Sequence, residues 1–256
     1  MESNAVFLTE NVDLELYRVK SVPNTIYYIP DFLLADEEAY LLQKVQDAPK
    51  PKWTQLTNRR LQNWGGHPHV KGMIAEDLPS WLQVYASKIG KLGLFGDKVP
   101  NHVLVNEYVA GQGIMPHVDG PVFFPTITTL NLGSHTVLDF YTTLKDEVSP
   151  TAHATSFSDV IEVDQPIPDE QSQPSDRHAF SLLLRPRSLV IIKDDVYTGY
   201  LHGIREVRND TIDGKIANLP QTGAALGEIL ARETRVSLTI RLAQKTSKFK
   251  FNVFRT

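Results

Sequence analysis

The chain has 256 residues, no cysteine, and 26 basic against 30 acidic side chains, for a formal net charge of −4. This length allows one large domain or two small ones, the missing cysteine excludes disulfides and thiolate sites, and the acidic balance argues against a protein dominated by polyanion binding. The acid-bearing N-terminus does not resemble a signal peptide, and no apolar run approaches ~20 residues. We therefore expect a protein of the cytoplasm and nucleus that does not associate with membranes.

The first hundred residues predict one strand and two helices around an irregular segment. Residues 25–30 (TIYYIP) are β-branched and aromatic, as in a short strand. Residues 31–49 have apolar side chains at helical spacing behind an acidic first turn, and residues 78–92 predict a second helix with Pro79 in its first turn. Residues 50–70 mix basic, aromatic and turn residues, which indicates a structured loop or short strands.

From residue 101 the sequence becomes rich in strands. Six segments alternate or run apolar and β-branched: NHVLVNEYV, TITTLNLG, HTVLDFYTTL, FSLLLRP, SLVIIKDD and RVSLTIRL. Closely spaced strands with few helices between them predict an antiparallel sandwich or barrel. Polar stretches at about 145–178 and 205–233 interrupt the pattern and indicate insertions.

The stretch GIMPHVDG places His117 and Asp119 one residue apart. On a strand, residues i and i+2 point to the same face, so both side chains can reach one metal ion. Fe(II) accepts two imidazoles and one carboxylate on one side, which requires a third ligand from elsewhere. His202, in YLHGI after an apolar strand, is the best-placed candidate, and His135 stays open. A turn with a chance histidine is the simpler interpretation of H-x-D alone.

Two arginines add a candidate anion site. RVSLTIR places Arg235 and Arg241 on one face of a strand, with Ser237 and Thr239 between them. At about 3.3 Å per residue, their Cα atoms lie roughly 20 Å apart, so the long side chains could reach opposite ends of a small dianion. The alternative interpretation is that this strand face is exposed to solvent and that the two arginines bind no ligand.

A second polar face lies just upstream of His117. NHVLVNEY alternates so that Leu104, Asn106 and Tyr108 share one side of a strand. The amide and the phenol could complete the hydrogen bonding of a carboxylate or keto acid beside the metal.

N-x-Y, H-x-D, a distant H and R-x-x-x-x-x-R occur in this order and at β-rich spacing. With KWTQLTNRRLQNWGG, LGSHTVLDFY and LHGI, they resemble the AlkB-like family of Fe(II)- and 2-oxoglutarate-dependent dioxygenases over about residues 23–244. The resemblance implies a mainly β fold with flanking helices, with a double-stranded β-helix (jelly-roll) core at 101–244. An N-terminal helical and lid extension would occupy 23–100, between a tail at 1–22 and the core, and a basic tail would follow at 245–256.

The resemblance also implies residue roles. The implied iron ligands are His117, Asp119 and His202. The implied 2-oxoglutarate residues are Leu104, Asn106, Tyr108, Arg235, Ser237 and Arg241. Arg235 would hold the distal carboxylate with help from Tyr108 and Ser237, while Asn106 and Arg241 would support the end that chelates the metal. Serine at 237 is a departure, since the founding member has asparagine there.

The implied cofactors are Fe(II), 2-oxoglutarate as co-substrate, and O₂. Oxidative demethylation of alkylated or modified nucleic acid would yield succinate, CO₂ and formaldehyde, and we expect a monomer that acts on single-stranded or modified DNA or RNA. A second departure concerns the substrate. Two residues beyond the carboxylate ligand, where repair members often carry an aspartate, stands Pro121, which offers no side-chain hydrogen bond.

Residues 50–64 supply the predicted substrate contacts, because interleaved basic and aromatic side chains could contact phosphates and stack on an unpaired base. The candidates are Lys52, Trp53, Arg59, Arg60, Gln62, Asn63 and Trp64. The alternative is that the tryptophans pack this segment onto the core. Two other functions stay open: a dioxygenase acting on protein or small-molecule substrates, and a nucleic-acid-binding module with little turnover.

Overall fold

The computed structural model describes residues 12–23, 25–69, 71–143 and 177–247. Almost all of the predicted insertion at 145–178 lies outside the described residues, as does most of the predicted basic tail at 245–256. In the part of the chain that the structure describes, no helix has the length and apolar composition that crossing a membrane requires.

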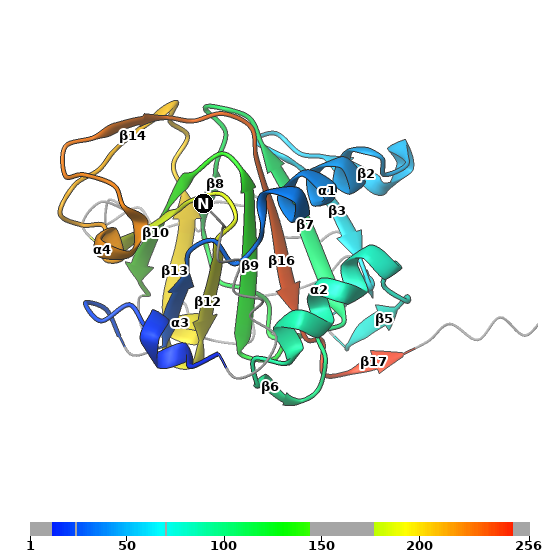
Figure 1. Cartoon of the computed structure of the whole chain (residues 1–256). Coiled ribbons are helices and arrows are strands. Elements are labelled where there is room, and N and C mark those ends of the chain that lie inside the picture. The colour runs from blue at the N-terminus through cyan, green and yellow to red at the C-terminus, as the bar shows by residue number, and fades with distance from the viewer. Residues whose placement is uncertain (1–11, 24, 70, 144–176, 248–256) are drawn as a thin grey trace, which may run out of the picture.

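A seven-stranded sheet forms the centre of the molecule, in the order β1-β12-β9-β16-β7-β3-β2 (Figure 1). Its strands are β1 (Ile26–Ile29), β12 (Leu189–Lys193), β9 (Thr126–Gly133), β16 (Arg235–Arg241), β7 (His102–Tyr108), β3 (Arg60–Trp64) and β2 (Trp53–Gln55). Every neighbouring pair in this sheet is antiparallel. The apolar alternation therefore predicted the central strands correctly.

A four-stranded sheet packs against one face of the large sheet. Its antiparallel strands are β11 (His178–Leu184), β10 (Thr136–Thr142), β13 (Tyr200–Ile204) and β8 (Ile114–His117), in that order. Leu138, Phe140 and Leu182 of this sheet share a buried cluster with Ile127 and Val190 of the large sheet. The two sheets thus form the predicted antiparallel sandwich of a jelly roll.

Helices cover the other face of the large sheet (Figure 1). They are α1 (Ala35–Gln46) and α2 (Ser80–Gly90), which are shorter than predicted at both ends. Leu41 of α1 and Ile89 of α2 pack with Leu238 of β16 in one fully buried cluster. Both faces of the large sheet are therefore buried, although they are buried against different layers.

Shorter elements complete the described chain. They are η1 (Leu14–Tyr17), η2 (Lys50–Lys52), β4 (Gly66–His67), β5 (Met73–Ala75), β6 (Leu94–Asp97), α3 (Asp194–Gly199), β14 (Asn209–Thr211), α4 (Leu219–Thr222), β15 (Ile229–Ala231) and β17 (Thr246–Ser247). The described part of the predicted irregular segment at 50–70 contains η2 and the short strands β2, β3 and β4. In the predicted insertion at 205–233, Ile212 and Ile216 pack against Val137 and Leu183 of the four-stranded sheet.

Candidate metal and co-substrate site

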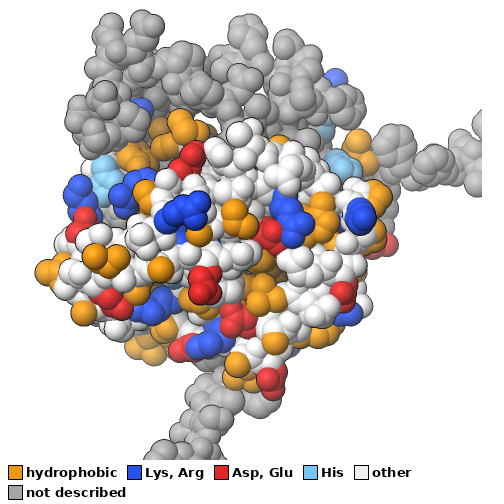
Figure 2. All heavy atoms as spheres, turned by 90° about the horizontal axis from the view of Figure 1, so that it is seen from above, with side chains coloured by type: hydrophobic (Ala, Val, Ile, Leu, Met, Phe, Trp, Pro, Cys, Tyr) orange, Lys and Arg blue, Asp and Glu red, His pale blue; other side chains and the backbone are white. Residues whose placement is uncertain are grey.

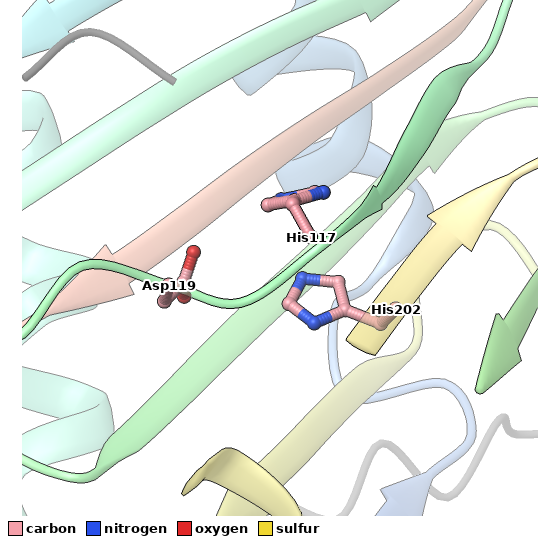
Figure 3. A group of neighbouring side chains, drawn as sticks. All are labelled: His117, Asp119 and His202. Atoms are coloured by element: carbon pink, nitrogen blue, oxygen red, sulfur yellow. The ribbon is translucent and has the colours of Figure 1, made fainter. Parts of the chain in front are cut away.

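Three side chains converge between the two sheets (Figure 3). His117 is the last residue of β8, and His202 lies directly opposite it on β13. The ligand atoms of His117, Asp119 and His202 all lie within 4.8 Å of one another. Asp119 follows the end of β8, so it reaches the histidines from a loop and not from the strand that the H-x-D spacing suggested. Two imidazoles and one carboxylate in this arrangement could hold Fe(II).

The backbone orients the ring of His117. Its Nδ1 lies 2.8 Å from the carbonyl oxygen of Met115. Because a carbonyl oxygen only accepts, Nδ1 carries the hydrogen and donates it, and Nε2 keeps its lone pair. His117 is thus prepared to bind a cation through Nε2.

The carboxylate of Asp119 is buried and charged. Burial alone would raise its pKa, but Arg241, His202 and His117 outweigh that effect and hold the pKa below its usual range. Arg241 Nη1 lies 3.4 Å from Oδ1, whereas Oδ2 has no hydrogen-bond partner among the described residues. A buried anionic oxygen without such a partner is unfavourable unless a cation binds it, so this set of donors fits a metal ion.

Arg235 provides a buried cation on the face of the large sheet that borders the candidate metal ligands. The residue is 5% exposed, and burial lowers the pKa of its guanidinium to about 10. Its Nη2 donates to Asn131 Oδ1 at 2.7 Å, while its Nε has no hydrogen-bond partner among the described residues. This arginine fits a carboxylate ligand, which would satisfy the remaining donor and the charge.

One cavity of about 60 Å³ joins these groups. Its polar lining is Asn106, Tyr108, His117, Asp119, Thr129, His202, Arg235, Ser237 and Thr239. Apolar side chains from both sheets complete the wall, among them Ile127, Leu138 and Ile204. Four of the six predicted co-substrate residues line the cavity. Leu104 and Arg241 lie outside its lining, and Arg241 contacts Asp119 instead.

Strand register explains why residues so far apart in sequence meet. In the antiparallel pair of β7 and β16, Tyr108 lies opposite Arg235 and Asn106 lies opposite Ser237. Because alternate side chains on a strand share one face, both polar rows point into the cavity. The alternative of a solvated arginine face is wrong, since Arg235 is 5% and Arg241 3% exposed.

His135, the other candidate for the third ligand, lies elsewhere. Its Nε2 is 3.3 Å from Oδ2 of the fully buried Asp210, and it precedes β10 rather than belonging to it. Asp210 also accepts two hydrogen bonds of 2.7 Å from Arg232. This histidine therefore lies beside the buried Asp210–Arg232 ion pair at β14 and outside the lining of the cavity.

Part of the predicted substrate segment faces the helices instead of the cavity. Arg60 Nε lies 2.6 Å from Glu107 Oε1, and its guanidinium stacks on the Trp53 ring at 4.0 Å. Gln62 is fully buried, and its amide donates to the carbonyl oxygen of Val45 on α1 at 2.8 Å. These side chains pack β2 and β3 against the helical layer.

The same packing includes Trp64 and Lys52. The Trp64 Nε1 donates to Gln62 Oε1 at 2.9 Å, and its ring meets Trp81 of α2 edge-on with centroids 5.8 Å apart. Lys52 Nζ lies 4.4 Å above the Trp64 ring and 3.8 Å from a carboxylate oxygen of Glu76. The structure therefore does not bring Lys52 or Trp64 to the cavity.

Two other members of the segment lie on the cavity side of β3. Arg59 is fully buried, and its Nε donates to Asn106 Oδ1 at 3.2 Å. Asn63 is half-buried and lies opposite Leu104, on the alternate face from Gln62. Of the seven predicted substrate residues, only Arg59 hydrogen-bonds to a residue of the cavity lining.

Two residues near the site were not predicted from the sequence. Asn131, on β9, accepts the hydrogen bond from Arg235. Tyr197, on α3, donates its hydroxyl to the carbonyl oxygen of Gly120 at 3.1 Å and so holds the loop that carries Asp119. The alternation of TITTLNLG could have indicated Asn131, since it shares a face with Ile127 and Thr129.

Residues 36–241 match the family described as the 2OG-Fe(II) oxygenase superfamily. The chain belongs to this superfamily, and it is an oxidoreductase of the dioxygenase class. Membership implies the use of Fe(II), 2-oxoglutarate and O₂.

The chain is 52% identical over 234 residues to "Probable RNA/DNA demethylase ALKBH6" of Danio rerio, a match that covers 91% of this chain and 92% of that protein. It is 28% identical over 233 residues to "Uncharacterized protein L905" of Acanthamoeba polyphaga mimivirus, covering 89% of this chain and 88% of that protein. The resemblance to AlkB-like dioxygenases is confirmed. The match to the solved structure "The structure of OsALKBH1" covers 86% of this chain and 99% of that chain, with 12% identity and a TM-score of 0.49.

Proposed function

We propose that this dioxygenase oxidatively demethylates alkylated or modified nucleic acid. One observation supports the assignment of the site: the histidine–aspartate–histidine group and Arg235 line the same cavity. His117, Asp119 and His202 would hold Fe(II), and Arg235 would bind the distal carboxylate of 2-oxoglutarate. When bound, the iron and the co-substrate supply the oxidation of a substrate C–H bond by O₂, with release of succinate and CO₂.

The residues of the chain orient these groups and set the polarity around them. The Met115 carbonyl fixes the ring of His117, and Arg241 keeps Asp119 ionised. The apolar side chains of the wall lower the local dielectric constant, which strengthens the attraction between the buried Arg235 and a bound carboxylate. An N-methyl group that is hydroxylated in this cavity would leave as formaldehyde.

Similarity supports the choice of nucleic acid as substrate. The relative from Danio rerio, at 52% identity, is named a probable RNA/DNA demethylase. Arg59 adds a buried cation on the cavity side of β3, beside Asn106. The substrate would therefore lie over the side of the cavity that Arg59 and Asn63 approach.

A second candidate is a dioxygenase that acts on protein or small-molecule substrates. Pro121 is exposed beside the site and offers no side-chain hydrogen bond to a base. Lys52 and Arg60 are engaged with aromatic rings and carboxylates. Among the described residues on the face shown in Figure 2, Lys and Arg side chains are interspersed with Asp and Glu and do not form a continuous basic surface for phosphates.

The assignment of the site is tested by turnover of 2-oxoglutarate with Fe(II), ascorbate and O₂. We expect the wild-type protein to form succinate and His117→Ala to form none, because the metal loses one of its three ligands. His67→Ala is the matched control, since His67 is exposed on β4 and outside the cavity, and it should retain turnover. Equal succinate formation by His117→Ala would contradict the assignment.

A substrate panel separates the two candidates. Release of formaldehyde from methylated single-stranded DNA or RNA, with methylated peptides and small molecules unchanged, is the result expected for nucleic acid. The reverse pattern would support the second candidate. Salt-dependent nucleic-acid binding that persists in a His117→Ala/His202→Ala double variant, with no turnover of any substrate, would instead indicate a binding module.

A further inference from the structure

We infer that Asn131 is a positioning residue that holds the guanidinium of Arg235 in place for the distal carboxylate of the co-substrate. The inference rests on the proposed function, because it assumes that Arg235 binds this carboxylate. Asn131 Oδ1 accepts a hydrogen bond of 2.7 Å from Arg235 Nη2, and Asn131 is fully buried on β9. Since the other alternate residues of β9 on this face, Ile127 and Thr129, line the cavity, Asn131 continues the same row.

The orientation of the Asn131 amide is determined by its other partners. Nδ2 donates to the carbonyl oxygen of Ser188 at 3.3 Å and to Ser188 Oγ at 3.2 Å. Ser188 Oγ in turn donates to the carbonyl oxygen of Arg185 at 2.6 Å. Because a carbonyl oxygen can only accept, the amide nitrogen must lie on the Ser188 side, and Oδ1 must face Arg235.

The backbone of Asn131 is held from both sides. Its N–H donates to the Ser188 carbonyl at 3.0 Å, and its carbonyl accepts from Arg187 N–H at 2.7 Å. On the other edge of β9, Asn131 lies opposite Ser237 of β16. A side chain with its backbone and its amide both fixed can hold one donor of Arg235 in a single direction.

A neutral acceptor suits this task better than a carboxylate would. Arg235 is buried and lies near Arg232, which like burial lowers the pKa of the guanidinium. An amide oxygen accepts a hydrogen bond from Arg235 and leaves its positive charge uncompensated, so the charge stays available to an incoming carboxylate. An aspartate in this place would form an ion pair with Arg235 and compete with the ligand.

Calorimetry of 2-oxoglutarate binding to the full chain loaded with Mn(II) tests this role. For Asn131→Leu we expect a dissociation constant roughly 10-fold higher than for the wild-type protein, since one hydrogen bond to a charged group is lost. Asn131→Asp should bind more weakly still. Mn(II) affinity should not change, because Asn131 does not belong to the group of candidate metal ligands.

A ligand that lacks the distal carboxylate shows whether Asn131 positions Arg235 or only supports the cavity wall. Binding of 2-oxobutyrate, which can chelate the metal but has no second carboxylate, should be equal in the wild-type protein and in Asn131→Leu. Ser188→Ala, which removes one acceptor of the Asn131 amide, keeps the inference testable if Asn131→Leu does not fold. It should weaken 2-oxoglutarate binding by roughly threefold without changing 2-oxobutyrate binding.

Thr128→Val is the matched control. Thr128 is fully buried on the same strand, and its hydroxyl donates to the Ile240 carbonyl at 3.1 Å, but it lies on the opposite face from Asn131. It should leave 2-oxoglutarate affinity unchanged. Equal 2-oxoglutarate affinity in wild-type and Asn131→Leu, or an equal loss for both ligands, would overturn the positioning role alone. If the wild-type protein showed no metal-dependent binding of 2-oxoglutarate, the proposed function would also fall.

Discussion

The two faces of the seven-stranded sheet are both buried, yet they differ in chemical character. On β16, Val236 and Leu238 point toward α1 and α2 and join an apolar cluster. The alternate residues Arg235, Ser237 and Arg241 are also buried, although they are polar or charged. One strand therefore contributes to the hydrophobic core on one face and to the candidate site on the other.

This difference shows how a strand that looks half-solvated in sequence can be buried on both faces. Burial of charged groups is costly unless they are paired or bind a ligand. Asp119 and Arg235 each keep one buried polar atom without a hydrogen-bond partner among the described residues. The cavity face is thus arranged to bind ligands. The apolar packing on the helix face offsets the cost of burying charged groups on the cavity face.

The largest effect is expected from a substitution on the cavity face. His202→Ala removes one of three ligand atoms that lie within 4.8 Å of one another, so turnover of 2-oxoglutarate should fall by more than about 100-fold. The free energy of unfolding without metal should change little, because His202 is only half-buried. If His202→Ala instead lowered the free energy of unfolding and retained turnover, this residue of the cavity face would contribute to stability and not to the site, contrary to the expectation.

A substitution on the helix face should have the opposite profile. Leu238 is fully buried, and Leu238→Ala leaves a cavity that we expect to cost about 2–5 kcal/mol of stability. Turnover per folded molecule should stay within about twofold of wild type. Urea unfolding and active-site titration measure the two quantities, and a loss of turnover without a loss of stability would contradict this expectation.

Arg60 tests whether the basic segment before Trp64 contributes to stability or to nucleic-acid binding. Its ion pair with Glu107 should be worth roughly 1 kcal/mol, because the Arg60 side chain is 37% exposed and solvent screens the pair. Arg60→Ala should lower stability by at least that amount, because the contact with the Trp53 ring is lost as well, and it should leave nucleic-acid affinity unchanged. A uniform loss of affinity, with a salt dependence reduced by about one phosphate contact, would instead show that Arg60 binds the backbone.

The smallest effect concerns alkaline stability of the helix face. Burial raises the pKa of Tyr85 on α2 to about 12, above its value of about 10 in the unfolded chain. The raised pKa means that the contribution of Tyr85 is fully present below pH 10 and is lost as the pH rises toward 12. Tyr85→Phe should therefore reduce the fall in unfolding free energy between pH 10 and 11. If the unfolding free energy fell equally between pH 10 and 11 in the wild-type protein and in Tyr85→Phe, the result would argue against a buried Tyr85 hydroxyl.

Much of the fold could be predicted because its strands alternate or run apolar over four or more residues. The strand at 25–30 and both long helices were predicted correctly apart from their ends. The H-x-D spacing brought His117 and Asp119 together, but it could not show that β8 ends at His117 and that Asp119 lies on a loop. Such boundaries depend on which backbone groups find partners in neighbouring strands.

The segment before Trp64 was the least predictable. Its basic and aromatic residues have the composition of a nucleic-acid contact, but β3 (RLQNW) does not alternate between apolar and polar side chains, so the sequence does not show which residues share a face. Gln62 faces α1 and Asn63 faces the cavity side because β3 pairs with β7, which is about 40 residues away in sequence. Asn131 was missed for a related reason, since its role requires Arg235, which joins the same sheet from the other end of the chain.

A crystal structure of the protein with Mn(II) and 2-oxoglutarate, with anomalous diffraction to locate the metal, tests the central claim most directly. We expect one anomalous peak bound by His117, Asp119 and His202, and a 2-oxoglutarate molecule whose distal carboxylate contacts Arg235. A metal peak elsewhere, or a carboxylate that does not contact Arg235, would contradict that claim.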